Sequence, residues 1–380
     1  MSKIQSVFIS SILVSACFIF SFILMGGDSV RKYLAVVKYD LLNQEFVQKR
    51  QSRATLELKN EEPNNDKPIL ILVWRKIDSR FRKFNLAGCP FQNCKTTLDR
   101  SLANNSDAIV FPGRYRTAFP AHRPEGQIWI YENNESQLRS LTGKRLQHFN
   151  GKINYTFTTL RESDIIHNYG HFRKRDTIMT EDANEWTKRG NKTKLVAWIV
   201  SHCRTHSKRE NYFKTLGKYI EADKFGRCAG GARKKCSRNC LESIAQEYKF
   251  YFAAENSICR DYITEKVFKN AYHLGMVPIV YGGANYSQYL PHKSYIDVKD
   301  FTSPKDLAEY LKKVASDDDL YNEYFAWKRE YEVVAGWSDC NICVFMNQKN
   351  KVPKVYEDIT TFWKTKDCVS GSWYLKSVSH

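Results

Sequence analysis

The chain has 380 residues, of which 42% are hydrophobic and 14% aromatic, enough to bury the cores of two domains. Its 59 Lys and Arg residues outnumber 41 Asp and Glu residues, and the net charge of +18 suits nucleic acid, an anionic membrane or a phosphorylated small ligand. The basic residues are scattered and form neither a stripe nor a known nucleic-acid module, so a phosphate-bearing ligand is favoured over nucleic acid.

The first predicted element is an apolar segment at the N-terminus. Residues 4–25 contain no charged side chain, and this length suits a helix that crosses a bilayer. A cleaved signal peptide is the alternative, but its apolar region is usually shorter and ends at a small-residue site. We predict a cytoplasmic tail over residues 1–3, a transmembrane signal-anchor over residues 4–25 and a polar stem over residues 26–66.

Two observations disagree about the side of the membrane that holds the body. More basic residues follow the apolar segment than precede it, which by the positive-inside rule places the body in the cytoplasm. However, ten cysteines remain when Cys17 in the anchor is left out, an even number that is typical of disulfide bonds in an oxidising lumen. Glycosylation sequons occur at Asn104, Asn134, Asn154, Asn191 and Asn285. The cysteines and sequons together favour a lumenal body.

Short apolar runs recur along the body and are predicted to be strands that are buried on both faces. They are residues 68–74, 108–111, 127–131, 195–200, 250–253 and 277–281. Helical stretches lie between or after them, at residues 209–220, 263–274 and 304–315. This alternation predicts α/β domains with parallel sheets, and two such domains facing a cleft are the simplest architecture.

The domain boundary is placed in the polar stretch 176–194. This gives an N-terminal acceptor-side domain over residues 67–180 and a C-terminal ligand-binding domain over residues 181–350. A C-terminal tail over residues 351–380 is expected to return to the body.

The segment 250–271 places polar side chains where a parallel sheet binds ligands. A buried strand ends at Ala253, and the next helix, predicted to begin near Asp261, carries Glu265 and Lys266 in its first turn. Ligands bind at the carboxyl ends of such strands, and helix N-termini attract phosphate. Lys266 would add positive charge, and Glu265 could accept hydrogen bonds from ribose hydroxyls. Spacing alone leaves open the alternative of a surface Glu-Lys pair.

The run Phe-Tyr-Phe-Ala-Ala-Glu-Asn-Ser-x4-Tyr-Ile-Thr-Glu-Lys-Val that begins at Phe250 resembles the signature segment of the α1,3-fucosyltransferases of glycosyltransferase family 10. Further similar motifs, such as Leu-Asp-Arg-Ser-Leu from Leu98 and Gly-Met-Val-Pro-Ile-Val-Tyr-Gly from Gly275, extend the resemblance over roughly residues 68–345. It implies a single-pass type II Golgi membrane protein with its catalytic body in the lumen. It also implies the GT-B fold, with two Rossmann-like domains facing a cleft, and transfer of fucose from GDP-fucose with inversion.

An inverting transfer needs a carboxylate that takes the proton from the acceptor hydroxyl, and positive charge for the diphosphate leaving group. In the family the base is the Glu of a Trp-x5-Glu-Ser segment, which begins here at Trp129 and identifies Glu135; Glu132 is the nearby alternative. The resemblance assigns the remaining roles to donor-binding residues: Arg209 and Lys266 to the pyrophosphate, Glu265 to the ribose, and Tyr262 with Asn256 to the phosphate or fucose.

Three positions depart from the family pattern. Gln137 stands where the family usually has Pro, His202 where it commonly has Asn, and Ala254 where it commonly has Phe. These departures leave open an alternative: the chain could be a catalytically weak or dead homologue that acts as a glycan-binding or assembly subunit. The presence of Glu135 and the donor-binding residues argues against it.

No dedicated metal motif is expected, and GDP-fucose is the only co-substrate required, although a dissolved divalent metal could stimulate transfer. The run Asp317-Asp318-Asp319 matches an Asp-x-Asp motif, but it follows a helix instead of ending a buried strand, so capping is predicted. Cys340 and Cys343 could begin a zinc site, but no second pair completes four ligands.

The predicted acceptor is the 3-hydroxyl of a GlcNAc residue in a glycoprotein or glycolipid glycan, and nucleic acid is excluded as a partner. The sequence does not decide between core and antennal GlcNAc, and it leaves disulfide pairing, oligomeric state and biological role open. Glycans are expected on Asn104, Asn154, Asn191 or Asn285, whereas Asn134 adjoins Glu135 and is expected to stay unmodified.

Overall fold

The computed structural model describes residues 68–75, 86–87, 89–179, 192–231, 236, 238–336 and 338–371. The chain divides into two compact units, Met1–Glu62 and Pro63–His380, of which only the second contains described residues. The predicted tail, signal-anchor and stem therefore lie outside the described residues. Within the described ranges, no helix is both long and apolar enough to span a membrane.

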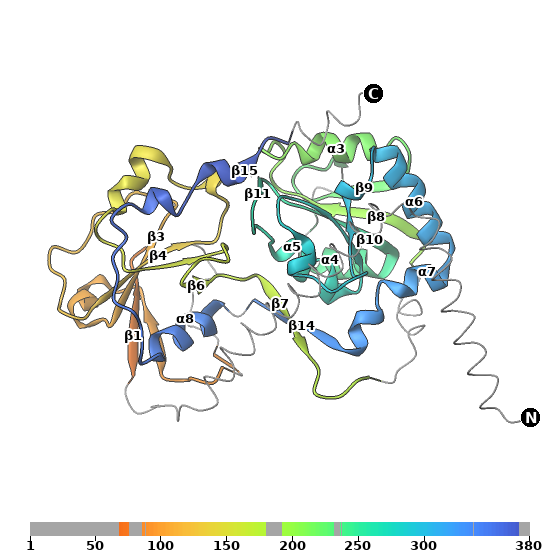
Figure 1. Ribbon diagram of the computed structural model, residues 1–380. Coiled ribbons are helices and arrows are strands. Elements are labelled where there is room, and N and C mark those ends of the chain that lie inside the picture. Colours follow the sequence, from red (N-terminus) through yellow and green to blue (C-terminus); the bar gives the residue numbers. More distant parts are fainter. Residues whose placement is uncertain are drawn as a thin grey trace, which may run out of the picture. The chain divides into compact units, whose positions relative to one another are not determined.

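A six-stranded parallel sheet occupies the N-terminal half of the described body (Figure 1). Its strands follow the order β2 (Cys94–Thr97), β1 (Ile69–Val73), β3 (Ala108–Pro112), β4 (Ile128–Asn133), β5 (Tyr155–Thr158) and β6 (Ile165–Ile166). Every neighbouring pair runs parallel. The continuous apolar runs of β3 and β4 arise because both faces of these strands are covered, and Ile109 and Ile130 are fully buried.

Residues from both ends of the described body cover this first sheet. One face packs against the helical turns η1 (Arg100–Asn105) and η3 (Gly143–Phe149) and the later turn η10 (Ile359–Thr361). A further turn, η2 (Gln137–Arg139), follows β4. Trp363 is buried in the same cluster as Phe111 and Trp129. Helix α8 (Ser338–Asn347) contacts β6, and its Phe345 lies 4.8 Å from the Tyr155 ring. The first core is thus completed by residues that follow the second sheet in sequence.

A second, five-stranded parallel sheet follows (Figure 1). Its order is β13 (Ile296–Asp297), β12 (Val277–Tyr281), β10 (Tyr248–Ala254), β8 (Lys194–Ile199) and β9 (Ala222–Phe225). Helices α3 (Arg209–Leu216), α6 (Pro304–Ser316) and α7 (Asp318–Glu323) pack on one face, and α4 (Arg238–Glu247) and α5 (Glu265–Phe268) on the other. This three-layer arrangement aims the carboxyl ends of β8, β10 and β12 at one edge, where ligands bind in such sheets.

Two small antiparallel pairs join distant parts of the chain. β7 (Gly170–Lys174) pairs with β14 (Tyr331–Ala335), and β11 (Ile258–Cys259) pairs with β15 (Cys368–Val369). The remaining short elements are η6 (Tyr272–Leu274), η7 (Tyr286–Gln288), η8 (Val298–Asp300), η9 (Ala326–Arg329) and η11 (Thr365–Asp367).

The six predicted strands are all present, but the predicted helix over residues 263–274 is wrong. Helix α5 begins after Thr264, its N-cap, and ends at Phe268, and η6 forms a separate turn. The amides of Lys269 and Asn270 both donate to the carbonyl of Glu265, which ends the regular helix, and the Asn270 side chain donates to Tyr251. A tertiary contact therefore overrides the helical pattern.

Ten cysteines form five disulfides, which confirms the predicted disulfide bonds. The pairs are Cys89–Cys340, Cys94–Cys343, Cys203–Cys228, Cys236–Cys240 and Cys259–Cys368. Because Cys340 and Cys343 belong to different disulfides, the zinc alternative is wrong. Two pairs tie α8 to the start of the first sheet.

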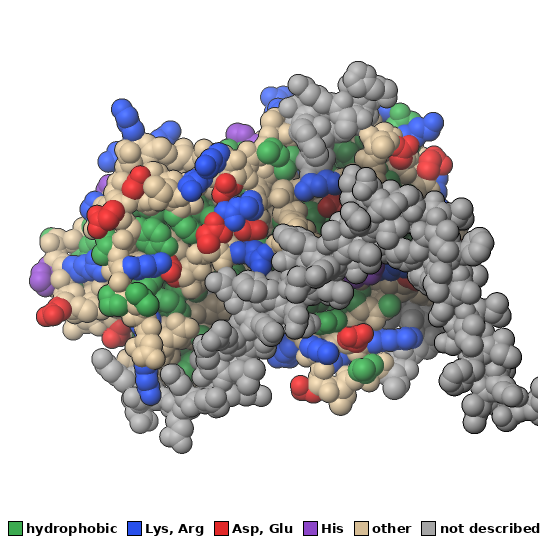
Figure 2. Space-filling view, in the orientation of Figure 1, with side chains coloured by type: hydrophobic (Ala, Val, Ile, Leu, Met, Phe, Trp, Pro, Cys, Tyr) green, Lys and Arg blue, Asp and Glu red, His purple; other side chains and the backbone are tan. Residues whose placement is uncertain are grey.

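The surface charge agrees with the scattered basic residues of the sequence. On the face shown in Figure 2, the described Lys and Arg side chains are interspersed with Asp and Glu and form no continuous stripe. Such a surface lacks the electrostatic footprint of a nucleic-acid groove on that face.

The long-range disulfides are expected to contribute more stability than the short one. Cys94–Cys343 closes a separation of 249 residues, whereas Cys236–Cys240 closes only four. Replacing both Cys94 and Cys343 by Ser is expected to lower the free energy of unfolding by about 2–5 kcal/mol, measured by urea denaturation. The matched Cys236→Ser/Cys240→Ser variant should lose clearly less; equal losses would contradict the loop-closure account.

Candidate active site

The loops that follow β4 and β10 meet each other. The hydroxyl of Ser136 donates a 2.8 Å hydrogen bond to that of Ser257, and both side chains are buried. The Tyr169 hydroxyl, just before β7, donates a 2.7 Å hydrogen bond to the carbonyl of Asn134. This bond gives the loop after β4 a second point of attachment. The carboxyl ends of the two sheets therefore contribute to one site.

Glu135 lies at this meeting point. Its Oε2 accepts hydrogen bonds from the Tyr262 hydroxyl at 3.1 Å and from the Asn256 side-chain amide at 3.4 Å. Its Oε1 lies 3.7 Å from Arg114, and its side chain is 22% exposed. The Asn133 side chain accepts from the Glu135 backbone amide and fixes the turn. This carboxylate is oriented from both sheets and still reached by solvent.

Glu132, the alternative to Glu135, lies in a different environment. It is the second-last residue of β4 and is fully buried, and neither of its side-chain oxygens has a hydrogen-bond partner. His167 Nε2 lies 3.8 Å away. Burial raises the pKa of Glu132 to about 8, against an opposing effect of Arg114. Since solvent does not reach this acid, its environment favours Glu135 as the carboxylate that acts on a ligand.

Lys266 lies in a buried ion pair at the start of α5. Its Nζ donates to Glu255 Oε2 at 2.9 Å, and Glu255 also accepts from the backbone amide and hydroxyl of Thr264. Burial by itself would lower the Lys266 pKa, but Glu255 and Glu265 raise it above its ordinary value. Lys266 therefore stays positively charged beside the helix N-terminus.

Glu255 is a member of the site that the sequence did not single out. It follows β10 directly, and its side chain is completely buried. The sequence contained a signal for this role: Glu255 directly follows a buried strand, and a carboxylate that is buried there requires a cation nearby. Glu265, in contrast, is 39% exposed at the first position of α5 and lies 3.4 Å from Lys266 Nζ.

Arg209, the first residue of α3, lies against the end of β10. It is only 3% exposed, and its Nη1 donates to the Ala254 carbonyl at 2.5 Å. Nη2 lies 3.5 Å from the carbonyl of His202, and the guanidinium carbon is 5.5 Å from the Trp198 ring centroid. The guanidinium thus joins the strand end to the helix start.

Several buried polar atoms around these loops have no partner. Among the described residues they include Arg209 Nε, Asn256 Oδ1 and Gln137 Nε2. Buried polar groups are nearly always hydrogen-bonded, because an unsatisfied one costs about 1–3 kcal/mol. Of these three residues, Asn256 also contacts Glu135 through its side-chain amide.

The structure thus brings the six predicted catalytic and donor-binding residues into one region. Glu135, Asn256 and Tyr262 are in contact, and Lys266 with Glu265 starts the helix that follows them. Arg209 reaches the carbonyl at the end of the strand that precedes Asn256.

The glycosylation candidates differ in their surroundings. Asn104 and Asn285 are exposed, and Asn191 lies outside the described residues. The Asn154 side chain is engaged on both sides: its amide donates to the Lys354 carbonyl, and its oxygen accepts from the Trp129 amide. Glycosylation of these residues stays a prediction.

The Asp-rich run serves as a helix cap, as predicted. Asp317 is the N-cap of α7, and its side chain accepts from the Leu320 amide at 3.0 Å. In the part of the chain that the structure describes, no group of three or more His, Cys, Asp or Glu side chains is arranged to hold a metal ion.

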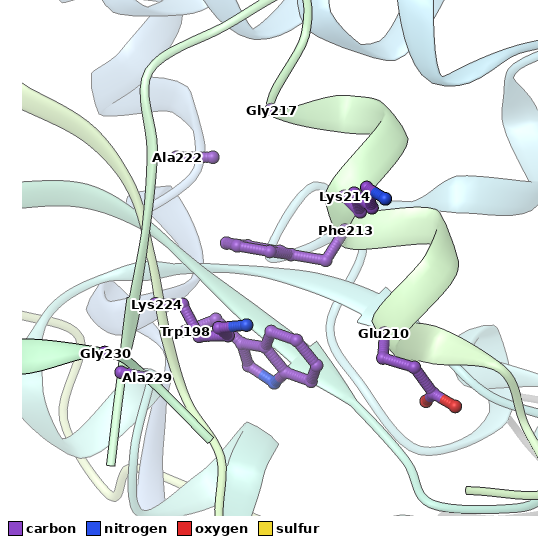
Figure 3. A pocket seen from close by; sticks show the side chains of 9 residues that line it. All are labelled: Trp198, Glu210, Phe213, Lys214, Gly217, Ala222, Lys224, Ala229 and Gly230. Atoms are coloured by element: carbon purple, nitrogen blue, oxygen red, sulfur yellow. The ribbon is translucent and has the colours of Figure 1, made fainter. Parts of the chain in front are cut away.

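A separate cavity of about 450 Å³ lies beside α3 (Figure 3). It is lined by the aromatic rings of Trp198 and Phe213 and by the charged side chains of Glu210, Lys214 and Lys224. None of the predicted donor-binding residues lines it.

Two family models match the chain. The model described as glycosyltransferase family 10 (fucosyltransferase) C-term matches residues 189–363, and the model described as fucosyltransferase, N-terminal matches residues 66–170. A solved structure described as an α1,3-fucosyltransferase has a TM-score of 0.53 at 14% identity, covering 80% of this chain and 96% of that chain. It shows that the two share an α/β fold.

Two curated relatives have the same identity but different coverage. Glycoprotein 3-alpha-L-fucosyltransferase A of Drosophila melanogaster is 36% identical over 300 residues, which is 76% of this chain and 58% of that protein. The 4-galactosyl-N-acetylglucosaminide 3-alpha-L-fucosyltransferase 9 of Bos taurus is 36% identical over 281 residues, which is 71% of this chain and 73% of that protein.

The buried acid Glu132 gives a pH-dependent stability prediction. Its pKa rises from 4.5 to about 8 on folding, so the folded state retains a proton that the unfolded state loses between these values. Stability from this group therefore falls as pH rises through that window, by at most about 1.4 kcal/mol per pH unit. Glu132→Gln lacks this loss, because its side chain does not titrate. The melting temperature of the variant minus that of the wild type is therefore expected to grow from pH 5 to pH 8. The exposed control Glu221→Gln should parallel the wild type, and a constant offset for Glu132→Gln would refute the assignment.

Proposed function

Because the chain belongs to glycosyltransferase family 10, the fucosyltransferases, we propose that it is an inverting α1,3-fucosyltransferase that uses GDP-fucose. The acceptor proposed is the 3-hydroxyl of a GlcNAc residue in an N-glycan or related glycoconjugate. The observation that carries this proposal is the Glu135 carboxylate, which is partly exposed and hydrogen-bonded by Tyr262 and Asn256 from the second sheet.

Glu135 would act as the general base. In a single displacement, its carboxylate takes the proton of the acceptor hydroxyl as the oxygen attacks the anomeric carbon of fucose and the bond to the diphosphate breaks. The hydrogen bonds that Tyr262 and Asn256 donate would hold the carboxylate in place. A weak or dead homologue is not favoured, since this carboxylate is present and oriented.

The donor would bind at the end of the second sheet. Lys266 and Arg209 would supply two positive charges for the diphosphate. Glu265, exposed beside Lys266, would accept hydrogen bonds from the ribose. Asn256 and Tyr262 would contact the phosphate or the fucose. No bound metal is required by these charges, although a dissolved one could stimulate transfer.

The domain organisation is part of the same proposal. We infer that residues 67–180 and 181–350 correspond to the two Rossmann-like domains of a GT-B fold that face a cleft, and that residues 351–380 return to the body. A helix over residues 4–25 would anchor the body in the Golgi lumen.

The acceptor is proposed only as a GlcNAc residue, core or antennal. One relative is named for glycoprotein acceptors, and the other for a 4-galactosyl-N-acetylglucosaminide. A panel of N-glycan and lactosamine acceptors with GDP-fucose would separate these two positions.

Glu135→Gln is expected to lower kcat at least about 100-fold, because the amide cannot take the proton. GDP binding should stay within about two-fold of the wild type, since the variant keeps the side-chain shape. Transfer is measured with radiolabelled GDP-fucose and GDP affinity by calorimetry. The exposed Glu125→Gln serves as the control and should be fully active. Retained activity of Glu135→Gln would show that another group is the base.

Lys266→Ala is expected to weaken GDP binding about ten-fold or more, because it removes a charge from the diphosphate site. Lys269→Ala, one turn later and exposed, should bind GDP like the wild type. Calorimetric titration with GDP measures both affinities. Equal losses in the two variants would indicate a general effect of surface charge, and no loss in either would place the diphosphate elsewhere.

A further inference from the structure

The last described residues of the chain lie against the donor-side loops. We call residues 365–371 the C-terminal strap. Strand β15 of the strap pairs with β11, which follows Ser257 in the donor segment, and the Cys259–Cys368 disulfide joins the two strands. Its turn η11 contacts η2, which follows Glu135 and Ser136.

Charge contacts fix the strap at its start. The Arg260 backbone amide donates to the Asp367 carbonyl at 2.9 Å, and the Arg260 guanidinium pairs with the Asp367 carboxylate at 2.9 Å. The same guanidinium also pairs with Asp261 at 3.1 Å and with Glu162 from the loop before β6. The strap is therefore tied to both sheets through one arginine.

The end of the strap touches the loop that leads to Arg209. The Gly371 amide donates to the His206 carbonyl at 3.3 Å. A Cβ atom placed on Gly371 would lie 1.9 Å from the carbonyl oxygen of Ser207 and 2.8 Å from the amide nitrogen of Lys208. Both neighbours are backbone atoms, so only glycine fits without moving the loop.

The other side of this loop rests on the donor-side strand ends. Ser207 is fully buried: its hydroxyl donates to the Glu255 carbonyl at 2.6 Å, and its amide donates to the Asn256 carbonyl at 3.1 Å. Its carbonyl accepts from the Tyr281 hydroxyl at 2.6 Å. The loop is thus held between the strand ends and the strap, two residues before Arg209.

We propose that the C-terminal strap is a fixed wall of the donor site, and that Gly371 and the Cys259–Cys368 pair are positioning residues for Arg209. The inference rests on the proposed function, because it takes the Arg209 region to hold the donor diphosphate. A displaced strap would shift the 206–208 loop and with it the guanidinium. Displacements of about 1 Å are enough to cost up to 100-fold in a site of this kind.

The test compares two glycine variants of the full-length chain by GDP titration calorimetry. Gly371→Ala is expected to weaken GDP binding about ten-fold. The control Gly217→Ala lies at the other end of α3, where a Cβ makes only ordinary contacts of 3.5 Å or more and φ is −66°, and its affinity should be unchanged. Equal affinity of the two variants would overturn the inference.

A kinetic measurement separates positioning from loss of fold. Gly371→Ala should raise KM for GDP-fucose about ten-fold while KM for the acceptor changes less than two-fold. An equal rise of both constants would refute a role specific to the donor. A wild-type chain that binds no GDP would instead refute the proposed function itself, so the two failures are distinguishable.

A second variant releases the strap without creating a clash. Cys259→Ser/Cys368→Ser is expected to weaken GDP binding several-fold, because the strap loses its covalent tie. The matched control Cys236→Ser/Cys240→Ser removes a disulfide that lies on another segment and should keep its GDP affinity. Unchanged affinity after loss of the Cys259–Cys368 pair would also overturn the inference.

Discussion

The contact of Glu135 with Tyr262 and Asn256 is the interaction on which the rest of the site depends. It joins a carboxylate after β4 of the first sheet to donors that follow β10 of the second. Two hydrogen bonds from residues that follow the second sheet's central strand keep the carboxylate oriented while part of it stays exposed. This arrangement forms only when the carboxyl ends of both sheets meet, so the proposed general base would depend on the position of one sheet relative to the other.

The donor side obeys a second constraint, the burial of charge. Glu255 is fully buried and must be paired, and Lys266 with Thr264 supplies that pairing. The same arrangement keeps the ammonium charged beside the start of α5, ready for an anion. Arg209 is held by the carbonyl of Ala254, so both cations have fixed positions before a ligand arrives. In the proposed mechanism, these fixed charges would stabilise the diphosphate leaving group at little cost in reorganisation.

The sequence predicted the parts that depend on local pattern and not those that depend on distant contacts. Apolar runs located six strands, because burial on both faces leaves a continuous signal. The helix expected over residues 263–274 was broken by the contact between Asn270 and Tyr251, which no local pattern encodes. Motif resemblance supplied Glu135 and the donor residues, but not Glu255. The pairing of Cys259 with Cys368, 109 residues apart, could not be read from spacing.

A crystal structure of the chain with GDP would show whether the diphosphate binds at the end of the second sheet. We expect the diphosphate within hydrogen-bond reach of Lys266 and Arg209, with the ribose beside Glu265 and the terminal phosphate facing the Glu135 carboxylate. The cavity beside α3 is the alternative place for the diphosphate, because two lysines that could pair with it, Lys214 and Lys224, line this cavity. A diphosphate bound there, away from Glu135, would contradict the proposed mechanism.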